Sequence, residues 1–533
     1  MATISEALNA AVRFHQNGNL LEAERLYREI LQTNPRHADA WHLLGLVVYQ
    51  RGDLAAALDS IGRATQLDPL QASYHNHLGE VYRAMRHWPQ AEACCRQAVE
   101  LKEDFAIAHN TLGAVLADQG KLAEAVASYR RAVKHDPDYA QAHSNLGAAL
   151  QRMSRLDEAI ACYHRSIACD PSYAVAWNQL GTALFKQGNF DEAVDHYRQA
   201  LRLDPRLAAA ENNLGALFQS QSKWDEAVEC YQRALAIEAD CAETHFNLGV
   251  IFHTQGRAAR AVESYQNAIR ANPQHAGAYN NLGAIFKRQD KLREAIECYE
   301  RALEFRPDFA EALNNLGNAF QLQSRNAEAM VCYEQTLRID PDHAQAHYNR
   351  SRMLLAGGDF SAGWREYEWR LKCSDLEKQA FAEPRWQGEP LDGRTLLVHA
   401  EQGLGDVLQF IRYVPLIAHS GGKILVEVPK ALVPLLEQSA IPGLVARGVP
   451  RQAFDVQVPL MSLPLVCGTT LETIPSRVPY LAAHPQRVEY WHRTLGGQQS
   501  FKVGIAWQGS PTYPGDRFRS IPLAQFAPLA RQG

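Results

Sequence analysis

The residues best suited to chemistry lie in a glycine-rich turn, Glu401-Gln-Gly-Leu-Gly-Asp406. A strand-like stretch precedes this turn and a helix-like stretch follows it. Such a turn directs backbone N–H groups and the positive end of a helix toward an anion. Gln402, Gly403 and Gly405 are therefore candidate substrate-binding residues. Asp406 is a candidate for chemistry, with capping of its own helix as the alternative.

Two nucleotide-binding motifs do not fit this turn. Leu408 stands where a dinucleotide fingerprint has its third glycine, and no Gly-Lys-Ser/Thr sequence follows. Both the NAD site and the P-loop are therefore weak interpretations.

A row of amides is the second candidate site. It consists of Asn145, Asn213, Asn247, Asn281, Asn315 and Asn349, which share one phase of a 34-residue spacing. An Asn side chain offers a donor and an acceptor, which suits an extended peptide backbone. The alternative is that each Asn bonds locally to a neighbouring helix end.

The elements that position this row follow from a strict internal repeat. The glycines stand 34 residues apart, at Gly45, Gly79, Gly113, Gly147, Gly181, Gly215, Gly249, Gly283 and Gly317. An Ala follows each of them by twelve residues, a Tyr stands four further on in most units, and a Pro closes most units. Each unit therefore holds two amphipathic helices joined by a short polar turn.

The small residues have a packing reason. A Gly inside a helix costs ~1 kcal/mol against Ala, so its repetition indicates a neighbouring helix too close for a side chain. We expect the Ala to make the same close approach and the Tyr to fill the gap against the next unit. One unit cannot bury its apolar faces alone, so the units must stack into a superhelix.

These positions resemble the tetratricopeptide repeat over residues 1–374, about eleven units. The first unit has Ala11 in place of the Gly, and the last has Ser351 and the aromatic stretch Trp364-Arg-Glu-Tyr-Glu-Trp369. A departing last unit is typical of a cap against a different domain. The Asn row is similar to the asparagine ladder of O-GlcNAc transferases, which implies a protein or peptide partner on the inner wall of the superhelix.

Two further columns are interpreted as packing. The Tyr column occupies a fixed core phase, where a ring packs and its hydroxyl finds a partner. Small packing residues are expected at Cys94, Cys162, Cys230, Cys298 and Cys332. No His spacing suits a metal, so we expect no metal site.

The 34-residue phase ends near residue 375, and the residues that follow predict a different fold. Pro384, Gly388, Pro390 and Gly393 indicate a linker over 375–393. Strand-like runs at 395–399, 424–428 and 454–458 alternate with helical segments such as 407–414. This alternation predicts a parallel, Rossmann-like α/β domain over 394–499. A strand-like run at 502–507 would begin a second such domain, incomplete over 500–533.

The C-terminal motifs resemble a GT-B glycosyltransferase module similar to the heptosyltransferase family (glycosyltransferase family 9). They are the Gly-Asp turn, Pro384-Arg-Trp-Gln-Gly388, Trp507-Gln-Gly-Ser-Pro511 and Asp516-Arg-Phe-Arg-Ser-Ile-Pro522. The resemblance implies that Asp406 is the general base on an acceptor hydroxyl. It also implies a nucleotide-sugar donor, with Arg517 and Arg519 beside its diphosphate, and no other cofactor.

Two functions remain open at this point. One is the repeat arm and acceptor-side half of an inverting glycosyltransferase, whose repeats present a protein or glycan acceptor. Because about 32 residues after Phe501 cannot bury a core of their own, we expect this chain alone not to be a competent transferase. The other is a non-catalytic scaffold with a degenerate α/β docking domain.

Composition excludes several other classes. Among 533 residues, 46% are hydrophobic and 21% are charged, and the net charge is -5, which argues against a general affinity for nucleic acid or acidic membranes. Ten cysteines without a Cys-x-x-Cys suit a reducing compartment. No signal peptide and no apolar run long enough to span a membrane are visible, so the expected location is cytoplasmic.

Overall fold

The computed structural model describes residues 3–373, 381–439, 441–450 and 452–495. Its contacts divide the chain into two compact units, 1–305 and 306–533, which are described separately.

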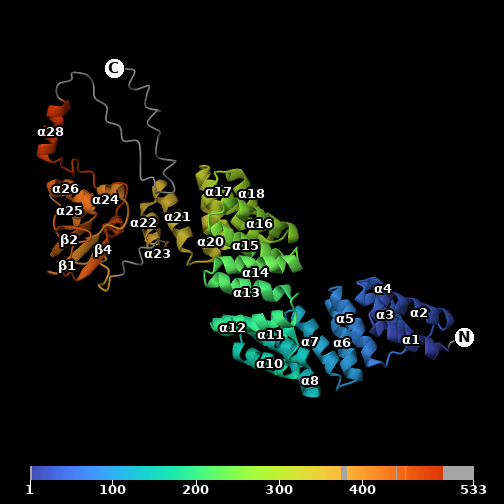
Figure 1. Ribbon diagram of the computed structural model, residues 1–533. Helices are drawn as coiled ribbons and strands as arrows, with labels where there is room; N and C mark the ends of the chain where they lie inside the picture. Colours follow the sequence, from blue (N-terminus) through green and yellow to red (C-terminus); the bar gives the residue numbers. More distant parts are fainter. Residues whose placement is uncertain (1–2, 374–380, 440, 451, 496–533) are drawn as a thin grey trace. The chain divides into compact units, whose positions relative to one another are not determined.

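The first unit is built from consecutive helix pairs (Figure 1). Its helices are α1 Ile4–Gln16, α2 Leu20–Thr33, α3 Ala38–Gln50, α4 Leu54–Leu67, α5 Ala72–Ala84, α6 Trp88–Leu101, α7 Ala106–Asp118, α8 Leu122–His135, α9 Ala140–Arg152, α10 Leu156–Cys169, α11 Ala174–Gln187, α12 Phe190–Leu203, α13 Ala208–Ser220, α14 Trp224–Ile237, α15 Ala242–Thr254, α16 Ala258–Ala271, α17 Ala276–Arg288 and α18 Leu292–Phe305. Each odd-numbered helix packs most closely on the even-numbered helix that follows it. The predicted two-helix repeat and its stacking are therefore confirmed.

Odd-numbered helices also pack on one another from repeat to repeat, as α5 does on α7 and α7 on α9. Within α1–α17, the even-numbered helices do not reach their next-but-one neighbours to the same extent. The first helices of the repeats are therefore spaced more closely than the second helices. Their free faces line the inner, concave side of the stack.

The repeat glycines are required by a close approach of the facing helix, as predicted, and the nearest atoms of that helix are mostly those of its Tyr. A Cβ on Gly215 would lie 2.8 Å from Cε1 of Tyr231, and one on Gly249 would lie 2.5 Å from the same atom of Tyr265. The Tyr ring thus fills the space over the Gly of its own repeat. The Tyr265 hydroxyl also reaches the next unit, where it accepts from Nδ2 of Asn281.

The Tyr column is buried, and several hydroxyls bond to a Gln twelve residues earlier. The Tyr231 hydroxyl donates to Oε1 of Gln219 at 2.8 Å, and the Tyr163 hydroxyl donates to Gln151 at 3.1 Å. Packing with a bonded hydroxyl is thus confirmed for these members of the column.

The turn inside each repeat needs one residue in the left-handed region. Glycine fills this position at Gly18, Gly52, Gly120, Gly188, Gly256 and Gly358, while Arg86, Ser154, Ser222, Asp290 and Ser324 adopt the same positive φ without being glycine. These five positions carry backbone strain that Gly avoids.

The second unit begins with two further repeats and ends in an α/β domain. Its helices are α19 Ala310–Leu322, α20 Asn326–Ile339, α21 Ala344–Ala356, α22 Phe360–Tyr367, α23 Arg370–Cys373, α24 Leu404–Phe410, α25 Val414–Ile417, α26 Val433–Leu436, α27 Leu463–Val466 and α28 Pro485–Leu495. Its strands are β1 Thr395–His399, β2 Lys423–Val428, β3 Leu444–Ala446 and β4 Val456–Pro459.

The four strands form one parallel sheet in the order β3-β2-β1-β4. Leu396 pairs with Ile424 on one side and with Val456 on the other, so β1 is central. The predicted strands at 395–399 and 424–428 are confirmed, and the one predicted at 454–458 is found as β4, which begins two residues later and ends at Pro459. The run at 502–507 lies outside the described residues.

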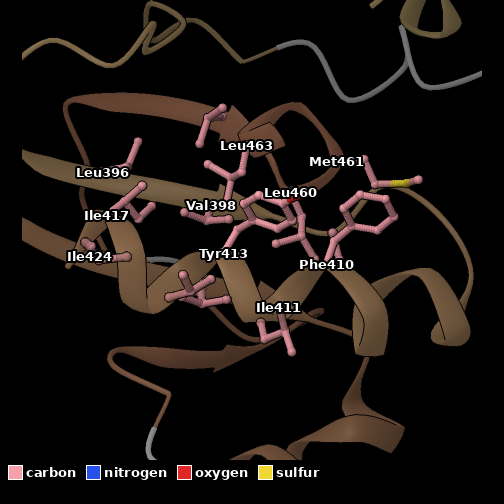
Figure 2. Close-up of a cluster of buried hydrophobic side chains, with 14 of the residues drawn as sticks. Leu396, Val398, Phe410, Ile411, Tyr413, Ile417, Ile424, Leu460, Met461 and Leu463 are labelled. Atoms are coloured by element: carbon pink, nitrogen blue, oxygen red, sulfur yellow. The ribbon is translucent and has the colours of Figure 1, made fainter. Parts of the chain in front are cut away.

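The core of the α/β domain is shared with the last repeat. Figure 2 shows Val398 of β1 beside Tyr413 and Leu396 beside Ile417, within one cluster of buried side chains. Trp364 and Tyr367 of α22 belong to the same cluster, with Trp364 edge-on to Phe410. The predicted aromatic cap therefore packs directly on the α/β domain.

Candidate functional site

The Asn row lies on the odd-numbered helices, where most of its members are half-buried and Asn349 is buried. Three of them bond to an Asn of the preceding repeat. The Nδ2 atoms of Asn145, Asn213 and Asn349 donate to the Oδ1 atoms of Asn110, Asn178 and Asn314, each at 3.0 Å. These amides tie α9 to α7, α13 to α11 and α21 to α19.

The remaining members differ in their side-chain bonds. Asn281 Nδ2 donates to the hydroxyl of Tyr265 at 3.3 Å, and its Oδ1 accepts from Asn280. Asn315 also has a partner. Within the described residues, no side-chain hydrogen bond is recorded for Asn247, whose donor and acceptor lie half-buried on α15.

The acceptors of this ladder form a second Asn column that sequence reasoning missed. It stands three residues before the repeat Gly and comprises Asn76, Asn110, Asn178, Asn212, Asn280 and Asn314. The signal was present in the Asn-Asn pairs at 212–213, 280–281 and 314–315. The bonds between repeats use one amide from each of the two columns.

A cavity of about 550 Å³ opens on the inner helices near the N-terminal end of the row. Asn110 and Asn145 line it, together with Glu80, Arg83 and Tyr139. The amide row therefore borders a real hollow at this point of the inner face.

The turn after β1 places Asp406 in the first turn of α24. Its Oδ2 accepts a hydrogen bond from the backbone N–H of Gly403 at 3.1 Å. Asp406 thus caps its own helix, as the alternative interpretation held, and remains half-buried. Because a Cβ on Gly405 would meet nothing within 4 Å, no close approach in the structure requires this glycine.

The topological switch point of the sheet lies between β1 and β4, which are neighbours. After β1 the chain adds β2 and β3 on one side of β1, and it then returns to add β4 on the other side. Ligands of open α/β sheets bind outside the carboxyl ends of the strands at this point. Here Glu401 follows β1 and Ser462 follows β4. Arg370 from α23 donates to Oε1 of Glu401 at 2.7 Å and to Oγ of Ser462 at 2.8 Å.

This guanidinium is buried, as is the Glu401 carboxylate, with side chains 2% and 1% exposed. Arg370 also pairs with Glu368 at 2.8 Å, and Arg385 bonds to both Glu368 and Ser462. Burial raises the pKa of Glu401 although Arg370 opposes the shift. The switch point of the sheet is thus filled by an ion network from the chain itself.

Gln402 lies beside this network, where its side chain bonds to Tyr367 and partly offsets the rise that burial causes in the Tyr367 pKa. Arg517 and Arg519 lie outside the described residues. The structure therefore brings Gln402, Gly403, Gly405 and Asp406 together in one turn and leaves the two arginines unplaced.

Metal and thiol chemistry find no support on the described part of the chain. No cluster of His, Cys, Asp or Glu there could hold a metal ion. Burial raises the pKa of the thiols, to about 11 for Cys94 and to about 12 for Cys230 and Cys298, so these thiols are poor nucleophiles. No described helix is long and apolar enough to cross a membrane.

Comparison with protein families identifies the repeats. Tetratricopeptide repeat models match residues 8–72, 75–106 and 310–343, and the C-terminal domain of cilia and flagella-associated protein 70 matches residues 106–314. The chain thus carries tetratricopeptide repeats. None of these matches is to a glycosyltransferase.

One relative and several solved structures are similar to parts of the chain. Protein FlbA of Caulobacter vibrioides is 30% identical over 183 residues, which are 30% of this chain and 31% of that protein. The chain therefore matches about a third of that relative's length.

Among solved structures, the Cut9–Hcn1 hetero-tetramer of APC/C has a TM-score of 0.41 at 15% identity, covering 70% of this chain and 94% of that one. PilF of Pseudomonas aeruginosa has a TM-score of 0.38 at 19% identity, covering 40% of this chain and 97% of that one. MamA has a TM-score of 0.29 at 24% identity, covering 32% of this chain and 94% of that one.

Proposed function

We propose that this chain of tetratricopeptide repeats is a protein-binding scaffold whose inner face captures an extended peptide segment. The observation that carries the proposal is the double Asn column on the inner helices. Where a member of one column bonds to a member of the other, the pair ties repeat to repeat, as Asn213 does with Asn178. Asn247 stands in the same column as Asn213 but makes no side-chain hydrogen bond to a described residue, so its half-buried amide is able to bond to a peptide backbone.

The test is capture of peptides by the full chain and by a variant with Asn247, Asn281 and Asn315 changed to Ala. We expect the wild type to retain peptides from an immobilised array and the variant to lose most of this binding. Asn267→Ala, on the even-numbered helix α16, is the matched control and should bind like the wild type. Equal binding by the triple variant would overturn the proposal.

A second candidate function is nucleotide-sugar-dependent glycosyl transfer by the α/β domain, in which Asp406 is the base and Arg517 and Arg519 hold the diphosphate. The parallel sheet with a central β1 and a carboxylate in the following turn favours it. Two observations weigh against it: Asp406 is engaged in capping, and Arg370 fills the switch point. We therefore place the scaffold first and the α/β domain as a docking platform on the last repeat.

A panel of sugar nucleotides distinguishes the two functions. If the α/β domain is a transferase, the complete open reading frame should hydrolyse or transfer one donor, and Asp406→Asn should abolish turnover while donor binding persists. A scaffold should turn over none of them. Turnover that survives Asp406→Asn would remove the assignment of this residue as the base.

A further inference from the structure

The cavity of about 550 Å³ on the inner face of the first unit has a defined chemical character. Three inner helices supply most of its lining, with Glu80 and Arg83 from α5, Asp118 from α7 and Asn145 from α9. Tyr49 of α3 and Tyr139 just before α9 add aromatic surface. A polar cavity with this mixture recognises a charged group that also has a flat or apolar body.

One carboxylate that lines the cavity is not neutralised by an ion pair within the described part of the chain. Arg83 donates to Oδ2 of Asp118 at 2.6 Å, so these two groups neutralise each other. Glu80 forms no ion pair with any described residue. Its Oε1 instead accepts from Nδ2 of Asn76 and from the Thr111 hydroxyl, both at 3.2 Å. These two donors orient the carboxylate without removing its charge.

Glu80 is also unusual within the repeat. It follows the repeat glycine directly, and the equivalent residues from Gly45 to Gly317 carry no charge: Leu46, Ala114, Ala148, Thr182, Ala216, Val250, Ala284 and Asn318. The periodic scaffold does not need an acid here. The carboxylate therefore marks one place on an otherwise uniform inner wall.

Two aromatic rings lie within the field of this carboxylate. Burial raises the pKa of Tyr49, and the charge of Glu80 adds to the rise. Burial also raises the pKa of Tyr139, and the charge of Glu80 again adds to the rise. A cation beside Glu80 would thus lie near tyrosine rings, whose faces attract positive charge.

We propose that this cavity, hereafter the Glu80 pocket, binds a basic side chain, Arg or Lys, of an extended peptide partner. The inference rests on the proposed peptide-binding function and adds the chemistry of one subsite. The cationic head pairs with Glu80, its stem or guanidinium plane lies against the tyrosines, and the peptide backbone passes Asn145. Arg fits best because its planar fork both stacks on a ring and bonds to a carboxylate.

The test uses fluorescein-labelled nine-residue peptide pools with random flanks and a fixed central residue: Arg, Lys, Glu or citrulline, the neutral isostere of Arg. Fluorescence anisotropy with the full chain should show Arg pools binding at least tenfold more tightly than citrulline pools. Glu80→Gln keeps an oxygen that accepts from Asn76 and Thr111, so it should fold normally and reduce this ratio to about one.

Two further variants test whether a free carboxylate in the pocket sets the preference for Arg. Arg83→Met frees the Asp118 carboxylate, so it should raise the Arg-to-citrulline ratio above that of the wild type. Glu100→Gln removes an exposed acid from the even-numbered helix α6 and should leave the ratio unchanged.

The outcomes separate the two proposals. Peptide binding that does not distinguish Arg from citrulline, or that prefers Glu, overturns the Glu80 pocket and leaves the scaffold standing. An unchanged ratio in Glu80→Gln also overturns it. Failure of every pool to bind overturns both proposals.

Discussion

Nη2 of Arg370 lies 2.7 Å from Oε1 of Glu401, although one residue belongs to the end of the last repeat and the other to the turn after β1. Both side chains are almost fully buried. A guanidinium buried in this way is tolerated because Glu368, Glu401, Ser462 and the carbonyl of Tyr367 all accept from it. The pair therefore joins the repeat cap to the sheet at the point where an open α/β fold would bind its ligand.

Removing one partner of this pair should be costly. Arg370→Met leaves the Glu401 carboxylate buried without a counterion, for which the expected loss is about 3–5 kcal/mol. Urea unfolding of the full chain, followed by tryptophan fluorescence, measures the loss through Trp364 and Trp386 in the shared core. Arg365→Met, at an exposed arginine of α22, is the control and should change stability little.

The double variant Arg370→Met with Glu401→Gln completes this test. The substituted glutamine amide is neutral, and its oxygen can still accept from the backbone N–H of Met461, as Glu401 does at 3.2 Å. We expect the double variant to regain most of the stability lost by Arg370→Met. A double variant as unstable as the single one would show that packing of the Arg370 stem, rather than charge, holds the cap.

The sequence predicted the repeats because their packing is periodic. A Gly at one phase and a Tyr sixteen residues later report the same contact in every unit, as Gly215 and Tyr231 do. β3 has no such signal, since it spans three residues. Its one clue is Gly443, with φ +60, where a Cβ would collide with the carbonyl of Ile424 on β2.

The candidate sites were predictable to different degrees. The Asn row was predictable from its 34-residue phase. Which of its amides bond between repeats depends on the partner that the preceding repeat offers, and the phase of the row does not give that partner. The Arg370–Glu401 pair joins residues with no periodic relation, so no spacing could indicate it. Capping by Asp406 was predictable because an acid three residues into a helix can reach back to its first amide.

A second prediction concerns the strained turns inside the repeats. Ser222 has φ +58 at the position where other repeats have Gly, and the N–H of Lys223 bonds to the carbonyl of Phe218 around it. The left-handed conformation costs a non-glycine residue about 1–2 kcal/mol, and part of the gain from Gly is offset by the entropy of its unfolded state. Ser222→Gly should therefore stabilise the chain by about 0.5–1 kcal/mol.

Thermal unfolding by circular dichroism measures this change. The control is Ser264→Gly, in the middle of α16, where Gly should instead destabilise by about 1 kcal/mol. If both variants shift the melting temperature in the same direction, the strain assigned to Ser222 is wrong.

A third prediction tests the close approach of the repeat glycine. In Gly215→Leu the new side chain must displace the Tyr231 ring, because its Cβ alone would lie 2.8 Å from Cε1. Overpacking of this kind should cost about 1–3 kcal/mol or more. Gly215→Ala should cost less, since the first repeat already places Ala11 in this position opposite a buried Tyr27. Urea midpoints in the order wild type, Ala, Leu would confirm the contact, and a neutral Leu variant would contradict it.

The last prediction separates the two roles of the Asn row. Asn213 Nδ2 donates to Oδ1 of Asn178 at 3.0 Å and to Oγ1 of Thr182 at 3.3 Å, so Asn213→Ala should destabilise by about 1 kcal/mol. For Asn247, which has no recorded side-chain bond within the described residues, the Ala variant should stay within about 0.5 kcal/mol of the wild type. Urea unfolding and peptide capture are measured on the same two variants. A row used for stacking alone would make capture follow stability, whereas a peptide-binding row makes Asn247→Ala lose capture at unchanged stability.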